Sequence, residues 1–375
     1  MADKYFIEPD INFINEIQKL GGASLKKCFQ CATCSVACPI SPDNKPFPRK
    51  EMIAASWGLK DRLISNADIW LCHQCGDCST LCPRGAKPGD VLGAVRSYAI
   101  SEYATPKSFA KMVNDPGKLP LLFIIPTIIF IIIGMITGQF SFSPAPGEIV
   151  QAKMFTPLLV QIIFPILTLF VVASFGMGLK RFLNDIHQNA IDSGLTDKKL
   201  DAGGVISGLF KILPTILKHD KFSECSENKD RATAHMLVLY SFIGLFIVTT
   251  IFFIVLDFFH IPGPYSQSNP IKWLANISGV ALVMGSLMMI KSRLGKTDQT
   301  TSYKDWYLLY LVFGLGFTGM LTEIARLIGF AGTCYISYFI HLILVFNLVV
   351  FLPYSKMAHI VYRTLAMAHS EYIKR

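Results

Sequence analysis

The chain contains CFQCATCSVACP at residues 28–39 and CHQCGDCSTLCP at residues 72–83. Both stretches place cysteines with gaps of two, two and three residues and end on a proline. Three thiolates at i, i+3 and i+6 can line one tight loop, and the proline turns the fourth cysteine away from them. This repeat governs the fold of the N-terminal part of the chain.

The spacing is the one with which bacterial ferredoxins hold two [4Fe–4S] clusters, the fourth cysteine of each run binding the other cluster. We therefore expect two clusters, whose ligand sets are Cys28, Cys31, Cys34 and Cys82, and Cys72, Cys75, Cys78 and Cys38. Structural zinc sites usually have two cysteine pairs separated by a long gap. Disulfides need an oxidising compartment, and we read no signal peptide in the first residues. Both alternatives therefore fit less well than clusters.

The composition divides the chain in two. Of its 375 residues 52% are hydrophobic and only 16% are charged, which is too apolar for an ordinary soluble protein. Residues 1–115 are mixed and polar, whereas residues 116–365 contain runs of about 20 apolar residues, the length that spans a bilayer. We expect six membrane helices, at 119–138, 156–179, 236–259, 273–290, 306–328 and 334–353.

Lysine and arginine in the loops predict the orientation. They are frequent in 180–233, in 291–305 and after the last membrane helix (Lys356 and Arg363, then Lys374 and Arg375 in the tail 366–375), and sparse in the loops on the other side. Both termini are therefore expected on the cytoplasmic side of the inner membrane. The net charge of +9 follows from this bias, and no basic run interleaved with aromatics points to nucleic acid.

The cytoplasmic parts are predicted to be helical as well. Residues 48–58 favour a short helix, another begins at Gly89, and 205–217 has the spacing of an amphipathic helix that lies on lipid headgroups or on a partner subunit. The fold class is therefore all-α: a helical two-cluster ferredoxin-like domain followed by a six-helix transmembrane bundle.

Four of the eight histidines lie in or at the ends of apolar runs: His235, His260, His341 and His359. Imidazoles are costly there and usually have a function, such as axial ligation of a b-type haem. We predict His235 and His359 as the ligands of a haem on the cytoplasmic side. On one continuous helix His341 would lie five turns from His359 on the same face, and with His260 it would bind a possible second haem.

The other histidines are predicted to lack such a role. We expect His73 to be an exposed loop residue, and the polar surroundings of His187, His219 and His369 predict solvated side chains. Cys225 and Cys334 are expected to be ordinary thiols.

Three charged residues lie near the outer end of the predicted bundle: Asp257, Glu323 and Arg326. Glu323 and Arg326, at i and i+3, can simply neutralise each other. Alternatively, Arg326 binds haem propionates and Glu323 or Asp257 accepts protons from a quinol.

The segment HLILVFNLVVFLPYSKMAH, residues 341–359, resembles the last helix of the γ subunit of respiratory nitrate reductases, which carries two haem-binding histidines 18 residues apart. The helix that begins at Ala234-His235 resembles the other haem helix of that family, and the similarity covers residues 231–365. The family has a second histidine ten residues later, where this chain has Leu245. That departure leaves His341 without its usual partner.

Residues 20–105 resemble the small iron–sulfur subunit of heterodisulfide reductases. The order of the two modules is similar to the membrane subunits of quinone-interacting membrane-bound oxidoreductase complexes of sulfate reducers. This resemblance implies menaquinone as the membrane carrier. It also implies cytoplasmic partners that contain flavin and clusters and are akin to the A-type subunits of heterodisulfide reductases. Adenylylsulfate reductase is implied as a further partner.

Together, these features predict a subunit that passes electrons between a quinone pool and cytoplasmic partners through haem b and two clusters. The alternative is a membrane-anchored iron–sulfur redox sensor or assembly subunit that carries no haem.

Overall fold

The computed structural model describes residues 8–43, 45–138, 140–141, 147–218, 231–295 and 302–375. Across these residues the chain is helical and contains no strand beyond an isolated bridge between Phe140 and Phe155. The predicted all-α class is confirmed. His219 and Cys225 lie outside the described residues.

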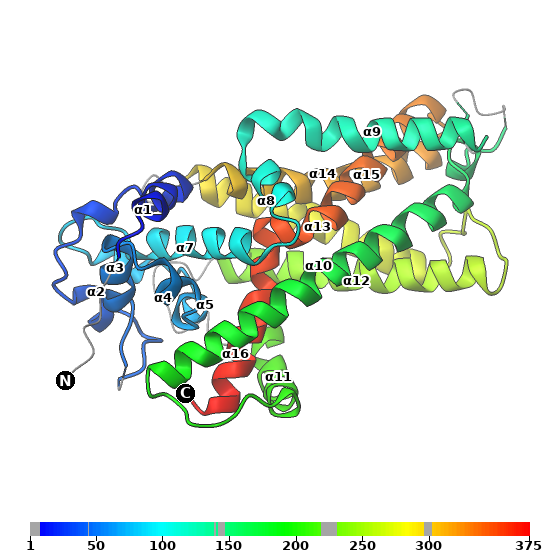
Figure 1. Cartoon of the computed structure of the whole chain (residues 1–375). Coiled ribbons are helices and arrows are strands. Elements are labelled where there is room, and N and C mark those ends of the chain that lie inside the picture. Colours follow the sequence, from blue (N-terminus) through cyan, green and yellow to red (C-terminus); the bar gives the residue numbers. More distant parts are fainter. Residues whose placement is uncertain (1–7, 44, 139, 142–146, 219–230, 296–301) are drawn as a thin grey trace, which may run out of the picture.

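Short helices build the N-terminal domain, residues 8–115 (Figure 1). The longest of them lies after the second cysteine run and leads toward the membrane helices. The helices are α1 (Ile11–Ile17), α2 (Thr33–Val36), α3 (Arg49–Ser56), α4 (Lys60–Ile64), α5 (Asp68–Leu71), α6 (Asp77–Thr80), α7 (Pro88–Tyr103) and α8 (Lys107–Asn114). The helices expected at 48–58 and from Gly89 are therefore present as α3 and α7.

Six of the described helices are long and apolar enough to cross a membrane. They are α9 (Leu119–Ile136), α10 (Pro157–Asp192), α12 (Arg231–Asp257), α13 (Pro270–Leu294), α14 (Tyr303–Leu327) and α15 (Ala331–Val350). Large apolar side chains such as Leu169 and Phe246 stay exposed on them, as expected of surfaces that face lipid rather than water. The helices lie roughly side by side in Figure 1, with the N-terminal domain at one end.

The second membrane helix is longer than predicted. We expected it to end at residue 179, but α10 continues to Asp192. No glycine or proline interrupts residues 180–192, and the chain leaves the helix at Gly194, where φ is +63°. This extension of α10 reaches the N-terminal domain.

The sixth membrane helix begins and ends three residues earlier than predicted, and the predicted continuous helix from His341 to His359 is wrong. Helix α15 ends at Val350, three residues before Pro353. Two short turns follow, and the Ser355 hydroxyl then accepts a hydrogen bond from the Met357 N–H (3.2 Å) as a new helix begins. The five-turn, same-face relation of His341 to His359 therefore does not hold.

The new helix, α16 (His359–Ile373), packs inside the molecule instead of forming a free tail. One face contacts α11 (Ala202–Lys218), the amphipathic helix predicted at 205–217. Helix α11 therefore packs on this chain's own C-terminal helix, although Ile206 and Phe210 on it remain exposed.

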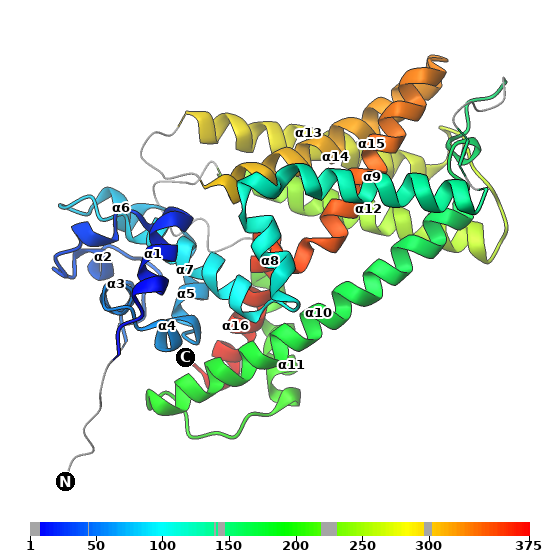
Figure 2. The same cartoon turned by 45° about the horizontal axis from the view of Figure 1, so that its top comes forward.

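A single buried core joins the N-terminal domain to α10 and α16. Trp70 of α5 stacks on Tyr362 of α16 (ring centroids 5.4 Å apart), and both meet Phe182 of α10 edge to face. Aromatic pairs of this kind each contribute about 0.5–1.5 kcal/mol beyond their area burial. Figure 2 shows α16 passing between the N-terminal domain and the membrane helices.

Candidate iron–sulfur and haem sites

The two cysteine runs have the same local backbone. In each, the second and fourth residues after the first cysteine have positive φ: Gln30 (+59°) and Ala32 (+71°), then Gln74 (+51°) and Gly76 (+104°). These left-handed residues turn main-chain N–H groups toward sulfur. The Gln30 N–H donates to Cys28 Sγ (3.4 Å), and the Gln74 N–H donates to Cys72 Sγ (3.3 Å). A short helix, α2 or α6, then carries the third cysteine.

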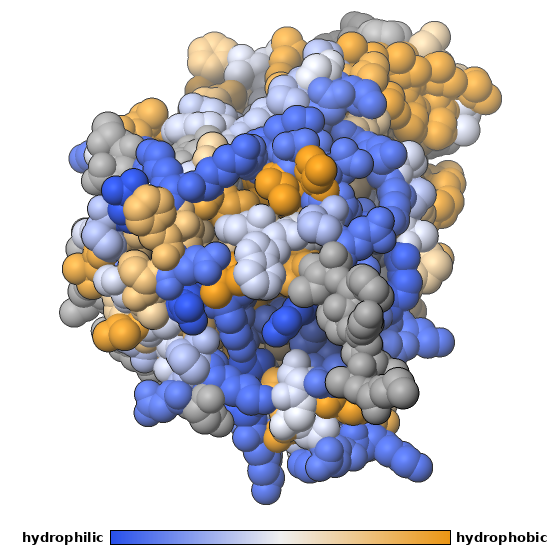
Figure 3. Space-filling model, turned by 60° about the vertical axis from the view of Figure 1, so that its left-hand side comes forward, coloured by the Kyte–Doolittle hydropathy of each residue, from blue (hydrophilic) through white to orange (hydrophobic). Residues whose placement is uncertain are grey.

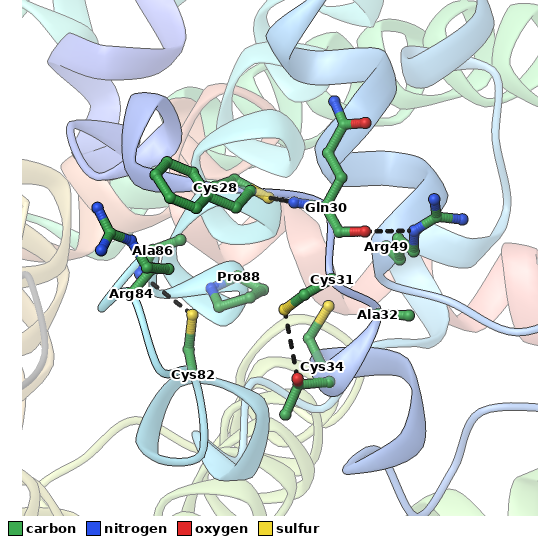
Figure 4. Close-up of a pocket in the computed structure, with 12 residues that line it drawn as sticks. Cys28, Gln30, Cys31, Ala32, Cys34, Arg49, Cys82, Arg84, Ala86 and Pro88 are labelled. Atoms are coloured by element: carbon green, nitrogen blue, oxygen red, sulfur yellow. Dashed lines mark hydrogen bonds between the residues drawn. The ribbon is translucent and has the colours of Figure 1, made fainter.

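The first candidate site, defined by Cys28, Cys31, Cys34 and Cys82, is a pocket that all of these cysteines line (Figure 4). Burial, together with the neighbouring sulfurs of the same set, raises the pKa of the Cys34 thiol to about 11. Cys31 is exposed, and a hydrogen bond from Thr33 lowers its pKa.

The second candidate site, defined by Cys38, Cys72, Cys75 and Cys78, is more enclosed, because Cys72 and Cys78 are buried. Burial, together with the neighbouring Cys72 and Cys75, raises the pKa of Cys38 to about 12. Burial also raises the pKa of Cys78, with further contributions from Cys72, Cys75 and Cys38. Cysteines of each set therefore lie close enough to influence one another electrostatically, and the division into two ligand sets stays a prediction.

The chemistry of these donor sets fits iron–sulfur clusters. Several thiolates gathered in a partly buried space repel one another unless a positive centre lies between them. Among the described residues, no group of three or more His, Cys, Asp or Glu is close enough to hold a single metal ion.

Sequence reasoning missed a contact that links the second site to the C-terminal helix. His73, predicted to be an exposed loop residue, is only partly exposed and meets the guanidinium of Arg363 (Nη2 to Nδ1 2.8 Å). Arg363 Nη1 also donates to the main-chain oxygen of Cys72 (3.4 Å). The partners are 290 residues apart in sequence, so no local pattern announces the contact.

Four residues before Arg363, His359 begins α16. Its Nδ1 lies 2.6 Å from the main-chain oxygen of Lys356, which can only accept, so we assign the ring proton to Nδ1. Burial lowers the pKa of His359 to about 3. The ring is therefore neutral near pH 7 and has its lone pair on Nε2, the arrangement typical of metal-binding histidines.

His341 has an equivalent arrangement within the membrane. Its Nδ1 lies 3.0 Å from the Thr318 hydroxyl on α14, and that hydroxyl donates its own proton to the Gly314 carbonyl (2.7 Å). The hydroxyl must then accept from Nδ1–H, which again leaves the lone pair on Nε2.

The other two predicted haem ligands lie on or after α12. His235 is partly buried in the first turns of that helix. His260 lies three residues beyond the helix end, is exposed and has a φ of +53°. The pairing of His260 with His341 stays a prediction.

Two of the charged residues predicted near the outer end, Glu323 and Arg326, belong to a network. Glu323 accepts from Arg326 (2.8 Å), Lys272 (2.9 Å) and the Gln267 amide. The ion pair expected from the i, i+3 spacing is therefore present, and Lys272 enlarges it. Asp257 accepts separately from the side-chain amide of Gln161.

The prediction of solvated side chains is wrong for His187 and His369. They are 5% and 0% exposed and lie 3.0 Å apart, Nδ1 to Nε2, between α10 and α16. His187 Nε2 donates to the carbonyl of Lys198 (3.0 Å). Their polar sequence neighbourhood does not reveal that the α10 extension is covered by α16 and by the segment that contains Lys198.

Residues 24–86 match the 4Fe-4S dicluster domain family. The chain is 41% identical over 91 residues to the C-type subunit of the H(2):CoB-CoM heterodisulfide,ferredoxin reductase of Methanothermobacter marburgensis, which is 24% of this chain and 49% of that protein. It is 35% identical over 98 residues to the C2-type subunit of the H(2)/formate:CoB-CoM heterodisulfide,ferredoxin reductase of Methanococcus maripaludis, which is 24% of this chain and 53% of that protein. The chain thus spans about half the length of these curated relatives. No solved structure matches.

The N-terminal domain is accordingly a 4Fe-4S dicluster module similar to the C-type subunits of heterodisulfide reductases. This similarity supports a role in iron–sulfur electron transfer within an oxidoreductase complex. The candidate membrane helices that follow it make the chain a multi-pass membrane protein.

Proposed function

We propose that this protein is a membrane electron-transfer subunit that connects the menaquinone/menaquinol pool to cytoplasmic subunits containing flavin and iron–sulfur clusters. The carriers are b haem and two [4Fe–4S] clusters. The resemblance to quinone-interacting membrane-bound oxidoreductases makes adenylylsulfate reductase the proposed eventual partner.

One observation carries the proposal: helix α16 begins at a histidine suited to metal binding and one turn later contacts the second candidate site. His359 and Arg363 are four residues apart and therefore share a helix face, and Arg363 contacts both His73 and the main chain of Cys72. A group held by His359 would thus be joined to the second site by a rigid element.

The assignment of side chains follows from these positions. A quinol releases two electrons. When bound, the haem and the clusters each carry one electron at a time, so the pair can be separated. Cys28, Cys31, Cys34 and Cys82 hold one cluster, and Cys72, Cys75, Cys78 and Cys38 hold the other. His359 and His235 are the proposed ligands of the cytoplasmic-side haem, and His341 with His260 those of a second.

The quinol would be oxidised near the outer end of the bundle. Its two phenolic protons need acceptors, and Asp257 and Glu323 are the carboxylates there. Arg326, already paired with Glu323, is suited to haem propionates. These roles are proposed from position and chemistry.

The proposal is tested by an optical spectrum of the purified chain, reduced with a menaquinol analogue and then with dithionite, together with haem, iron and sulfide analysis. We expect b-type absorbance reducible by quinol and two [4Fe–4S] clusters. Clusters without any haem would instead support the redox sensor or assembly subunit.

Histidine variants locate the haems. His359→Ala should remove the cytoplasmic-side haem, and His341→Ala the other. His260→Ala should match His341→Ala only if the predicted pair is right. Full haem content in both His359→Ala and His341→Ala would refute the ligand assignment.

A further inference from the structure

We propose that the surface around the first candidate site docks an acidic redox protein of the complex. This inference rests on the proposed function and adds where the soluble partner binds and by what chemistry. We call this surface the docking rim and define it by Phe29, Val36, Leu81, Lys26, Lys27 and Arg84.

Large apolar side chains stand exposed beside the cysteines of the first site. Phe29 is 67% exposed and lines the pocket of the first site, Val36 at the end of α2 is 88% exposed, and Leu81, next to Cys82, is 58% exposed. Helices α2 and α6, which lead to Val36 and Leu81, contact each other. Exposed apolar residues grouped around a functional site are typical of protein interfaces.

The charges on this surface have one sign. In residues 24–41 and 72–87 the exposed charged side chains are Lys26, Lys27 and Arg84, and the single acidic residue, Asp77, is buried. Arg84 lies over the Phe29 ring (4.0 Å to the centroid), so charge and apolar surface interleave. An acidic partner complements such a surface, whereas a second copy of this chain would bring like charges together.

The position of the rim fits an exit to a soluble partner. The second site is tied to α16 through Arg363, whereas no described contact of the docking rim involves a membrane helix. Figures 1 and 2 place α2 at the end of the molecule farthest from the membrane bundle. Figure 3 shows that this end has small hydrophobic patches set in a mainly hydrophilic face.

The test measures binding, independently of electron transfer. The full chain, with its clusters, is placed in nanodiscs of zwitterionic lipid and titrated at low and high salt with two probes: the acidic soluble domain of cytochrome b5 and basic cytochrome c. We expect the acidic probe to bind at low salt and to weaken as salt rises, because salt screens exposed charges, and the basic probe to bind far more weakly.

Charge reversal locates the binding surface. The triple variant Lys26→Glu, Lys27→Glu and Arg84→Glu should bind the acidic probe at least about tenfold more weakly and reverse the preference between probes. The matched control reverses three exposed lysines on the extension of α10, the segment that follows it and α11 (Lys180, Lys199 and Lys218, respectively), which changes the net charge equally and should leave the affinity unchanged. Phe29→Ser should weaken binding of the acidic probe without altering its salt dependence.

The outcomes separate this inference from the proposed function. If the clusters and haem are present but the rim and control variants behave alike, the docking rim is wrong and the proposed function stands. If vesicles of anionic lipid compete for the rim as effectively as the acidic protein, the surface is a lipid contact and the inference is overturned. A chain without reducible clusters would overturn the proposed function itself.

Discussion

At the scale of single residues, hydrogen bonds to Nδ1 prepare two imidazoles for metal binding. The Lys356 carbonyl performs this role for His359, and the Thr318 hydroxyl performs it for His341. Without such a partner, an imidazole can change tautomer or rotate, and ligation weakens.

We predict that Thr318→Val impairs haem binding at His341. Valine has nearly the same shape but cannot accept from Nδ1–H, and loss of such a partner typically costs 10–100-fold in metal affinity. The measurement is haem per chain after detergent washing, with the redox potential of the haem that remains. Thr322→Val is the matched control, because Thr322 is equally buried on α14 but bonds Ser337 (2.8 Å). Equal loss of haem in both variants would contradict the role of Thr318.

The pair His187–His369 predicts a pH dependence of stability. Burial, together with the neighbouring His187, lowers the pKa of His369 to about 4. Because the unfolded chain binds a proton near pH 6.5 and the folded chain does not, stability should fall as pH drops from about 6.5 to 4, by up to about 1.4 kcal/mol per pH unit.

The measurement is the thermal unfolding temperature of the full chain across this pH range. His369→Gln cannot take up the proton, so its unfolding temperature should vary less below pH 6.5 than that of the wild type. A slope as steep in the variant as in the wild type would show that other groups cause the effect.

At the scale of elements, α16 connects the parts of the molecule. It contacts α5, α10 and α11, and it supplies Tyr362 to the buried aromatic group and Arg363 to the second site. A helix in this position must be rigid to hold His359 at a fixed distance from the cysteines.

We predict that Arg363→Gln changes the electronic properties of the second cluster. The guanidinium lies beside His73 and the Cys72 carbonyl, and removing its positive charge should lower the cluster's reduction potential. The control is Arg181→Gln, since Arg181 also joins α10 to the N-terminal domain, through Thr105 and the Tyr103 carbonyl. Redox titration followed by electron paramagnetic resonance should show a shifted cluster only for Arg363→Gln; an unshifted signal would contradict the contact.

At the scale of the whole molecule, the sequence predicts what depends on local spacing. The cysteine sets follow from fixed gaps, and six of the described helices follow from apolar length. The break after Val350 could not be predicted, because proline is tolerated in membrane helices where neighbours satisfy the backbone. The contact of His73 with Arg363 and the burial of His187 and His369 depend on packing between distant segments, which no local pattern encodes.

The architecture places the two candidate sites in series, and this order is testable. The second site is tied to α16 and the first opens at the far end, so electrons from quinol should reach the second cluster before the first.

Cys31→Ala and Cys75→Ala form a matched pair, since each removes the second cysteine of its run. After mixing with a menaquinol analogue, freeze-quenched samples of Cys31→Ala should show reduced haem and a reduced second cluster. Samples of Cys75→Ala should show reduced haem, while the first cluster stays oxidised, although dithionite can still reduce it. Reduction of the first cluster at the wild-type rate in Cys75→Ala would mean that the path bypasses the second site, and the contact through α16 would then not be the route.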